Sequence, residues 1–306
     1  MNKRFGFVAN IVVGEERLYM RSVKLATIHK LGLEKIIEIY KANIDNTSQI
    51  IKYCINNGIS FYRMGSLFPF INHPVLESFD HLSYFQDDIY ELGQLAKVND
   101  IRISVHSSPY CILNSIKPDI VAKSVHELTK WADFLNLMDL PKNNRIVVHT
   151  GSTEGGKEVA KKRFVDNFNA LPDPIKNRLV LENDDKSYSF KNVEDIHKLT
   201  KVPIVIDIFH HRVYNPEKLD EIEALQRALK TWGDDEVPEI HFSCQDPLKV
   251  KGSHSANIDL DMIFDFLNNT KNLKFDIMLE TGPGANVELE RVMINVDPNW
   301  NKKYIL

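Results

Sequence analysis

Short apolar runs recur along the chain, and most of them stop at a residue that could bind a metal ion. In the segment V-I-D-I-F-H-H at 205–211, the apolar run that begins at Ile204 stops at Asp207, and two histidines follow. A continuous β-branched run is typical of a strand that is buried on both faces of a parallel sheet. We therefore predict a buried strand that ends at Asp207, with His210 in the loop after it.

The same arrangement recurs in other parts of the chain. The apolar runs there end at His106, His149, Glu182, His241 and Glu280. The stretches between them are roughly 25 to 45 residues long and mostly carry the spacing of helices. Strands and helices that alternate with this period predict an α/β protein, a single (β/α)8 TIM barrel that occupies residues 1–306 as one domain.

The pattern also predicts where the elements begin and end. The first strand is expected at 4–10, and a long connection without clear periodicity then leads to a helix at 34–57. A second strand is expected at 59–64, and no element is assigned beyond Thr281. Further helices are expected at 84–98, 119–138, 157–171, 193–199, 220–232 and 260–267.

Composition narrows the class of protein. The chain is 43% hydrophobic and 26% charged, and no apolar run approaches the roughly 20 residues of a membrane span. Three cysteines without a C-x-x-C pair do not suggest a disulfide framework. These features predict a cytoplasmic, intracellular protein. The net charge of −4 gives no general attraction to nucleic acid, so any such contact must be local.

In a TIM barrel the carboxyl ends of all strands surround one opening, so residues distant in sequence become neighbours. Glu182, Asp207 and Glu280 would then share one centre. Carboxylates about 6 Å apart repel by roughly 3 kcal/mol per pair at an effective dielectric constant near 20. Few lysines or arginines are expected at these strand ends to offset that repulsion.

Histidines, in contrast, are abundant there, at His106, His149, His210, His241 and His254. Neutral imidazoles add no charge but bind divalent metals well. Because this donor set exceeds what one tetrahedral ion can use, we expect two or three divalent ions. The mixed nitrogen and oxygen donors favour manganese or zinc; magnesium is a further alternative, but it does not favour so many imidazoles.

A glycine-rich segment, T-G-S-T-E-G-G-K at 150–157, opens the helix after the strand of His149. Such a loop can hold a phosphate through backbone N–H groups at a helix N-terminus. It is not a nucleotide-binding P-loop, because Glu158 stands where that motif requires Ser or Thr. The positive charges at 157–163 are most simply a solvated helix face, and Lys157 is kept as a candidate for substrate binding.

Several segments together resemble the UV damage endonuclease family over nearly the whole chain. They are R-F-G-F-V-A-N, Y-R-M-G-S-L-F-P-F-I-N-H-P, S-V-H-S-S-P-Y, V-V-H-T-G-S, L-E-N-D-D-K, V-I-D-I-F-H-H, I-H-F-S-C-Q-D-P, G-S-H and D-I-M-L-E. The resemblance implies a TIM barrel related to endonuclease IV. It also implies hydrolysis of the phosphodiester immediately 5′ of pyrimidine dimers, 6-4 photoproducts and some other lesions in double-stranded DNA, by a metal cluster that activates water. The protein would then be a monomer, associated with the nucleoid when it acts on DNA.

The resemblance also implies roles for individual residues. Glu182 would bridge two ions, with His106 and His149 on the first, Asp207, His241 and Glu280 on the second, and His210 and His254 on the third. Glu182, Asp207, His241 and Glu280 would be catalytic. Asn10 and Tyr110 would contact DNA, and Tyr110 would probe the damaged bases. His73 would be a ligand or would support the ligands.

Two positions depart from the family pattern. Pro109 stands where members often have Gln before the probing aromatic residue, so the DNA would be opened differently. Glu239 stands where some members have a lysine that becomes carboxylated, and it could supply the same negative charge. Residues two apart on a strand share a face, so Glu239 is expected beside His241.

Two other functions fit the same residues. Sugar isomerases and epimerases of the xylose-isomerase-like kind also place Glu, Asp and His at barrel strand ends. They generally use two ions and fewer histidines. The second alternative is a metal-dependent protein that binds DNA damage without cutting it.

Overall fold

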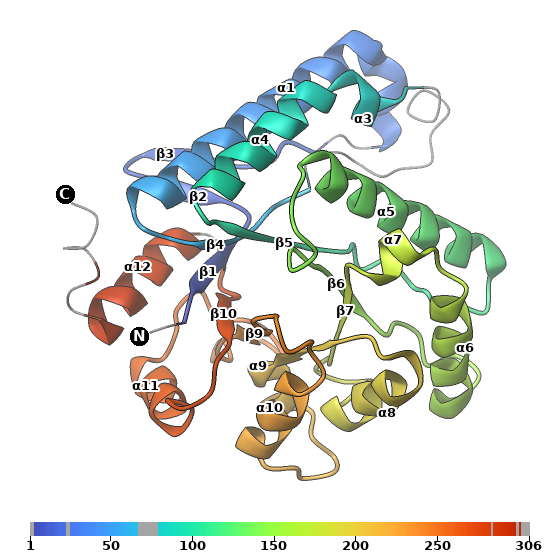
Figure 1. Cartoon of the computed structure of the whole chain (residues 1–306), viewed down its shortest axis with the longest axis vertical. Helices are drawn as coiled ribbons and strands as arrows, with labels where there is room; N and C mark the ends of the chain where they lie inside the picture. The colour runs from blue at the N-terminus through green and yellow to red at the C-terminus, as the bar shows by residue number, and fades with distance from the viewer. Residues whose placement is uncertain (1–2, 23–24, 67–78, 283, 298–299, 301–306) are drawn as a thin grey trace.

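The chain folds into a closed barrel of parallel strands with helices around the outside (Figure 1). This computed structural model describes residues 3–22, 25–66, 79–282, 284–297 and 300. The strands are hydrogen-bonded in the order β1-β10-β9-β8-β7-β6-β5-β4, and β4 pairs with β1 to close the ring. Their bounds are β1 Phe5–Val8, β4 Phe61–Arg63, β5 Arg102–His106, β6 Ile146–His149, β7 Leu179–Glu182, β8 Ile204–Asp207, β9 Glu239–Phe242 and β10 Asp276–Leu279. The predicted TIM barrel is confirmed.

The helices form the outer layer, as Figure 1 shows. They are α1 Leu25–Asn56, α3 His81–Tyr84, α4 Gln86–Val98, α5 Pro118–Leu137, α6 Lys157–Asn169, α7 Asp173–Lys176, α8 Phe190–Thr200, α9 Ile208–Val213, α10 Glu221–Leu229, α11 Leu260–Asn269 and α12 Ala285–Val296. Each longer helix buries an apolar stripe; on α5, for example, Leu128, Trp131 and Leu135 are buried. No helix among the described residues is long and apolar enough to cross a membrane.

The structure corrects the sequence prediction near the N-terminus. The stretch after β1 contains an antiparallel hairpin, β2 Ile11–Val13 and β3 Glu16–Leu18, and α1 begins at Leu25 rather than at residue 34. Gly32, with φ 69° and ψ 163°, interrupts α1, and this conformation is open to glycine at little steric cost. The predicted helix at 34–57 is therefore the part of α1 that follows this interruption.

A second correction concerns the segment after β8. The expected loop is a short helix, α9, because the Asp207 side chain accepts a hydrogen bond from the backbone N–H of His210 and caps it. His210 therefore projects from the first turn of a helix. A third correction lies beyond Thr281, where α12 follows Gly284.

The register of the strands aligns the residues predicted to meet. His149 lies beside Glu182 across β6 and β7, and Asp207 lies beside His241 across β8 and β9. Because parallel strands carry these residues at the same end, their side chains converge at the carboxyl-terminal mouth of the barrel.

The other end of the barrel interior is filled, so the barrel is not a pore. Trp232 packs there with Val147, Val180 and Val205, and its indole N–H donates to the carbonyl of Ile204. The guanidinium groups of Arg102 and Arg145 lie near the Trp232 ring, with Cζ 5.7 and 5.4 Å from its centroid.

Candidate metal centre

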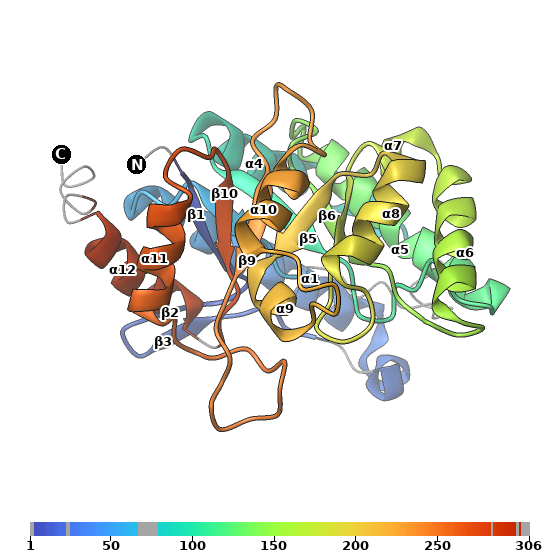
Figure 2. The same ribbon diagram turned by 90° about the horizontal axis from the view of Figure 1, so that it is seen from below.

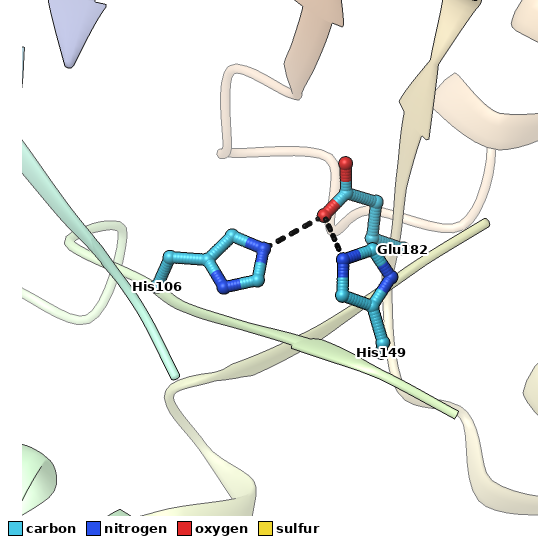
Figure 3. Close-up of side chains that lie close together, drawn as sticks. All are labelled: His106, His149 and Glu182. Atoms are coloured by element: carbon cyan, nitrogen blue, oxygen red, sulfur yellow. Dashed lines mark hydrogen bonds and ion pairs between the residues drawn. The ribbon is translucent and has the colours of Figure 1, made fainter. Parts of the chain in front are cut away.

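The first group of potential ligands joins three strands. His106 Nε2 lies 3.0 Å and His149 Nε2 3.5 Å from the same carboxylate oxygen of Glu182. Figure 3 shows a ring nitrogen of each histidine directed at that oxygen. The other ring nitrogen of His106 lies 2.8 Å from the Ser107 carbonyl, where an N–H would donate and leave Nε2 free to bind a metal.

The second group uses the other oxygen of Glu182. His241 Nδ1 lies 2.7 Å from Glu182 Oε1 and 3.1 Å from Glu280 Oε1, and Asp207 completes the group. The ligand atoms of these four residues lie within 4.8 Å of one another. The two oxygens of Glu182 therefore face two different groups of potential ligands.

The third group consists of Asp207, His210 and His254. His210 Nε2 faces His254 Nε2 at 3.1 Å, and His210 Nδ1 lies 3.6 Å from Asp207 Oδ2. Two neutral imidazoles cannot both present lone pairs to each other favourably, whereas a cation between them would satisfy both. Asp207 is thus a member of both the second and the third group, as Glu182 is of the first and the second.

Burial supports the assignment of this site to cations. The Asp207 side chain is fully buried, and its Oδ2 accepts no hydrogen bond from any residue that the structure describes. Glu182 is 1% exposed, and His241 is fully buried. Because a buried carboxylate without adequate partners is costly, these residues fit divalent ions, which accept this mixture of nitrogen and oxygen donors.

The pKa values of Glu182 and His241 also show that the buried carboxylates attract positive charge. Burial alone would raise the pKa of Glu182, but the imidazoles of His241 and His149 hold it well below its usual range. Burial and Arg63 would lower the pKa of His241, yet Glu182 and Glu280 raise it to about 10. Without metal, the carboxylates therefore attract a proton to His241.

Arg63 is a member of this site that the sequence did not lead us to expect. It ends β4, its side chain is 4% exposed, and it contacts the Glu280 carboxylate and the His241 ring. Its Nη2 also lies 3.2 Å from Glu239 Oε1. The expectation that few basic side chains stand at these strand ends therefore missed one arginine, although Y-R-M ends a strand as the ligand-bearing segments do.

Glu239 precedes His241 by two residues on β9, and both side chains face the barrel interior. It is fully buried, it accepts a hydrogen bond from Ser104 Oγ at 3.1 Å, and Arg102 Nη2 lies 3.6 Å from its Oε2. Burial would raise its pKa, but His241, Arg102 and Arg63 hold it at about 2. These partners therefore favour the ionised form of Glu239.

A cavity of about 530 Å³ opens beside the third ligand group. Its lining includes four potential ligands from the three groups, His149, His210, His254 and Glu280. The loop that carries Ser108 and Pro109 also lines it. Asp184, Asp185 and Lys186 also line it, and the sequence prediction had assigned no role to these three.

The remaining predicted residues lie outside the ligand groups. Tyr110 is 82% exposed on the loop after β5, and Asn10 follows β1. The ammonium of Lys157 lies 3.0 Å from the Tyr214 hydroxyl and 3.3 Å from Asn192 Oδ1, and this residue does not line the cavity. His73 falls outside the described residues.

Known proteins resemble this chain over nearly its whole length. A family model described as UV-endonuclease UvdE matches residues 3–293. The chain belongs to this family. Within the UvdE family, the UV DNA damage endonuclease of Bacillus cereus strain Q1 is 32% identical over 291 residues, which cover 92% of this chain and 90% of that protein. The relative from Clostridium perfringens is 32% identical over 250 residues, 81% of this chain, but the match spans only 60% of that relative.

Solved structures agree with the assignment to UvdE. The crystal structure of SacUVDE superposes with a TM-score of 0.87 at 29% identity, over 98% of this chain and 99% of that one. A D-psicose 3-epimerase from Clostridium cellulolyticum H10 superposes with a TM-score of 0.53 at 16% identity, over 84% of this chain and 89% of that one. At that identity the epimerase shows a shared fold alone.

Proposed function

We propose that this UvdE-family protein is a metal-dependent DNA repair endonuclease. It would hydrolyse the phosphodiester immediately 5′ of pyrimidine dimers, 6-4 photoproducts and some other lesions in double-stranded DNA. The observation that carries the proposal is the arrangement of Glu182 and Asp207, each shared by two ligand groups, at the mouth of a barrel that belongs to this family.

The ligand groups suggest how two or three ions would be held. His106, His149 and Glu182 would hold the first, Glu182, Asp207, His241 and Glu280 the second, and Asp207, His210 and His254 the third. Manganese is the proposed ion, with zinc or magnesium as alternatives. When bound, divalent ions neutralise phosphate oxygens and lower the pKa of water.

The chain's own residues would orient the ligands and the substrate. The carbonyls of Ser107 and Asn183 fix the ring orientations of His106 and His210, at 2.8 and 3.0 Å from their Nδ1 atoms. Glu280 and Arg63 hold His241 in the interior. We propose that Glu239 maintains the negative charge behind this histidine without any modification.

The DNA would lie across the cavity and be probed from the loop after β5. Tyr110 is free to reach a substrate, since 82% of it is exposed. Photoproducts stack and pair poorly, so extruding them costs less than extruding intact bases, and an inserted aromatic ring would fill the gap. Asn10 and Lys157 are proposed as further DNA contacts, although Lys157 would first have to leave Tyr214.

A defined substrate tests the proposed function. The manganese-loaded protein should incise a duplex that contains one cyclobutane pyrimidine dimer, immediately 5′ of the dimer, and should leave the identical undamaged duplex intact. Product mapping on a sequencing gel gives the position of the cut. Equal inertness toward both duplexes, together with epimerisation of ketohexoses by the same preparation, would reject the nuclease in favour of a sugar epimerase.

A further inference from the structure

The loop after β9, residues 245–254, exposes apolar side chains beside the candidate metal centre. Leu248 is 93% and Val250 80% exposed. Figure 2 shows this loop, drawn in orange below β9, projecting beyond the barrel. Exposure of these two branched apolar side chains to water costs free energy. Their burial against a partner would therefore be favourable.

Hydrogen bonds inside the loop hold these side chains outward. The base is closed by the bridge between Gln245 and His254, and the Asp246 N–H donates to the Ser253 carbonyl at 2.8 Å. The Gln245 side chain donates to the Val250 carbonyl at 3.1 Å and accepts from the Gly252 N–H at 2.9 Å. The loop is therefore ordered by its own polar groups, and the apolar side chains of Leu248 and Val250 take no part in that order.

Gly252 fixes the loop against the rim of the cavity. Its φ of 90° suits glycine, and a Cβ there would lie 2.1 Å from Asp185 Oδ2. Gly252 and His254 line one side of the cavity, while Ser108 and Pro109, which precede Tyr110, line another. The loop and the Tyr110 loop thus border the same opening.

Distance and charge indicate which partner would cover the tip. Lys251 is three residues and Leu248 six residues from the potential ligand His254. Even a fully extended chain would therefore keep the tip within roughly 20 Å of the candidate metal centre. This distance corresponds to about six base pairs of duplex DNA at a rise of 3.4 Å. Lys249 pairs with Asp246 at 2.9 Å, whereas exposed Lys251 has no ion pair within the described ranges. An apolar tip beside a free ammonium suits a DNA groove, with bases inside and phosphates along the edge.

We propose that the 245–254 loop is a second DNA-contacting element, which places Leu248 and Val250 in a groove of duplex DNA and Lys251 against a phosphate. This inference rests on the proposed nuclease function. It assigns the two sides of the cavity different tasks: the Tyr110 loop probes the lesion, and the 245–254 loop holds the flanking duplex.

The test uses the double variant Leu248→Ser/Val250→Ser of the full chain in manganese. Its matched control is Val98→Ser/Leu199→Ser, which changes exposed apolar residues near the carboxyl ends of α4 and α8, at the opposite end of the barrel. Two quantities are measured: the protein concentration that half-saturates single-turnover incision of the dimer duplex, and the Kd for a labelled undamaged duplex by fluorescence anisotropy. Both should rise about tenfold in the loop variant, because two apolar side chains lose their burial, and less than twofold in the control.

Further variants separate packing from charge. Leu248→Met/Val250→Ile should bind as the unchanged protein does, since apolar volume is retained. Lys251→Ala should reduce the slope of log K against log salt concentration by about 0.9, the contribution of one phosphate contact to duplex DNA.

The outcomes distinguish the loop from the nuclease function. Loop variants that bind both duplexes as tightly as the control would overturn the inference while the unchanged protein still cuts. A second copy of the chain on the tip, seen by sedimentation as a dimer that Leu248→Ser/Val250→Ser dissociates, would overturn it too. If the unchanged protein cuts neither duplex, the nuclease proposal fails, and the anisotropy of the undamaged duplex still reports on the loop.

Discussion

The two ends of the barrel interior both bury acids, but they neutralise them differently. At the amino-terminal end, Asp276 and Arg102 are each 3% exposed and lie 2.9 Å apart. At the carboxyl-terminal mouth, Glu182 and Asp207 are equally buried, and most of their neighbours are imidazoles. The first end therefore neutralises its acids with its own guanidinium groups, whereas the acids at the mouth would be neutralised by protons on the imidazoles or by bound cations.

The comparison teaches that burial of an acid does not by itself indicate a metal site. What distinguishes the mouth is that most neighbours of its carboxylates are imidazoles rather than guanidinium groups. Arg63 links the two ends of the barrel interior. It contacts Glu239, which also pairs with Arg102, and Glu280, which is a potential metal ligand. The following predictions test whether the two ends are separate in function.

The largest effect is expected from Glu182→Gln, which removes the shared charge of two ligand groups. Incision of the dimer duplex should fall by about a thousandfold or more, because several kcal/mol of metal-dependent stabilisation would be lost. Bound metal, measured by elemental analysis, should fall with it, while the folding stability of the metal-free protein should not. Unchanged incision by Glu182→Gln would refute the assignment of Glu182 as a ligand. If the protein is a nuclease, this variant should lose incision but still bind the lesion.

The opposite pattern is expected at the other end. Arg102→Met leaves Asp276 and Glu239 buried with fewer cationic partners, which should cost about 3–5 kcal/mol of unfolding free energy. Denaturant titration followed by circular dichroism measures the loss. The metal content of the folded protein should stay the same, and a variant that loses metal but keeps its stability would show that the two ends are not separate.

Removal of metal should destabilise the protein through the mouth alone. Manganese at about 100 times its Kd should add roughly 2.7 kcal/mol of stability relative to chelated protein, since it binds the folded state. Thermal unfolding with chelator and with manganese gives the shift in Tm. The shift should vanish in Glu182→Gln and persist in Arg102→Met; a shift of equal size in both variants would place the metal elsewhere.

The smallest effect is expected at Arg63. Arg63→Met should lower metal-free stability by about 2 kcal/mol, because Glu239 and Glu280 lose a charged hydrogen-bond partner. Part of that loss should be recovered in manganese, so the metal-dependent shift in Tm should exceed that of the unchanged protein. Arg63→Lys should fall between the two, since it keeps the charge but not the planar fork. An unaltered shift would mean that Arg63 only supports the barrel.

The sequence by itself determined the class of fold and most of the ligand set. A buried strand is recognisable from three consecutive apolar residues such as those before His149 and Glu182, because both of its faces meet other side chains. In a parallel barrel every such strand ends at the same mouth, so the residue after each run is placed without knowledge of its neighbours. The apolar runs alone therefore indicate Asp207, His241 and the other strand-end residues as members of one site.

Only the tertiary structure decided which groups share an oxygen, where charges are paired and which loops border the cavity. Arg63 reaches Glu280 because the barrel closes β4 against β1, a contact between residues more than 200 positions apart. Lys157 turns to Tyr214 for a similar reason, because folding brings together two residues that are 57 positions apart. The periodicity of a segment depends on its own few residues, whereas the direction of a long side chain depends on the charges that closure of the barrel brings within its reach.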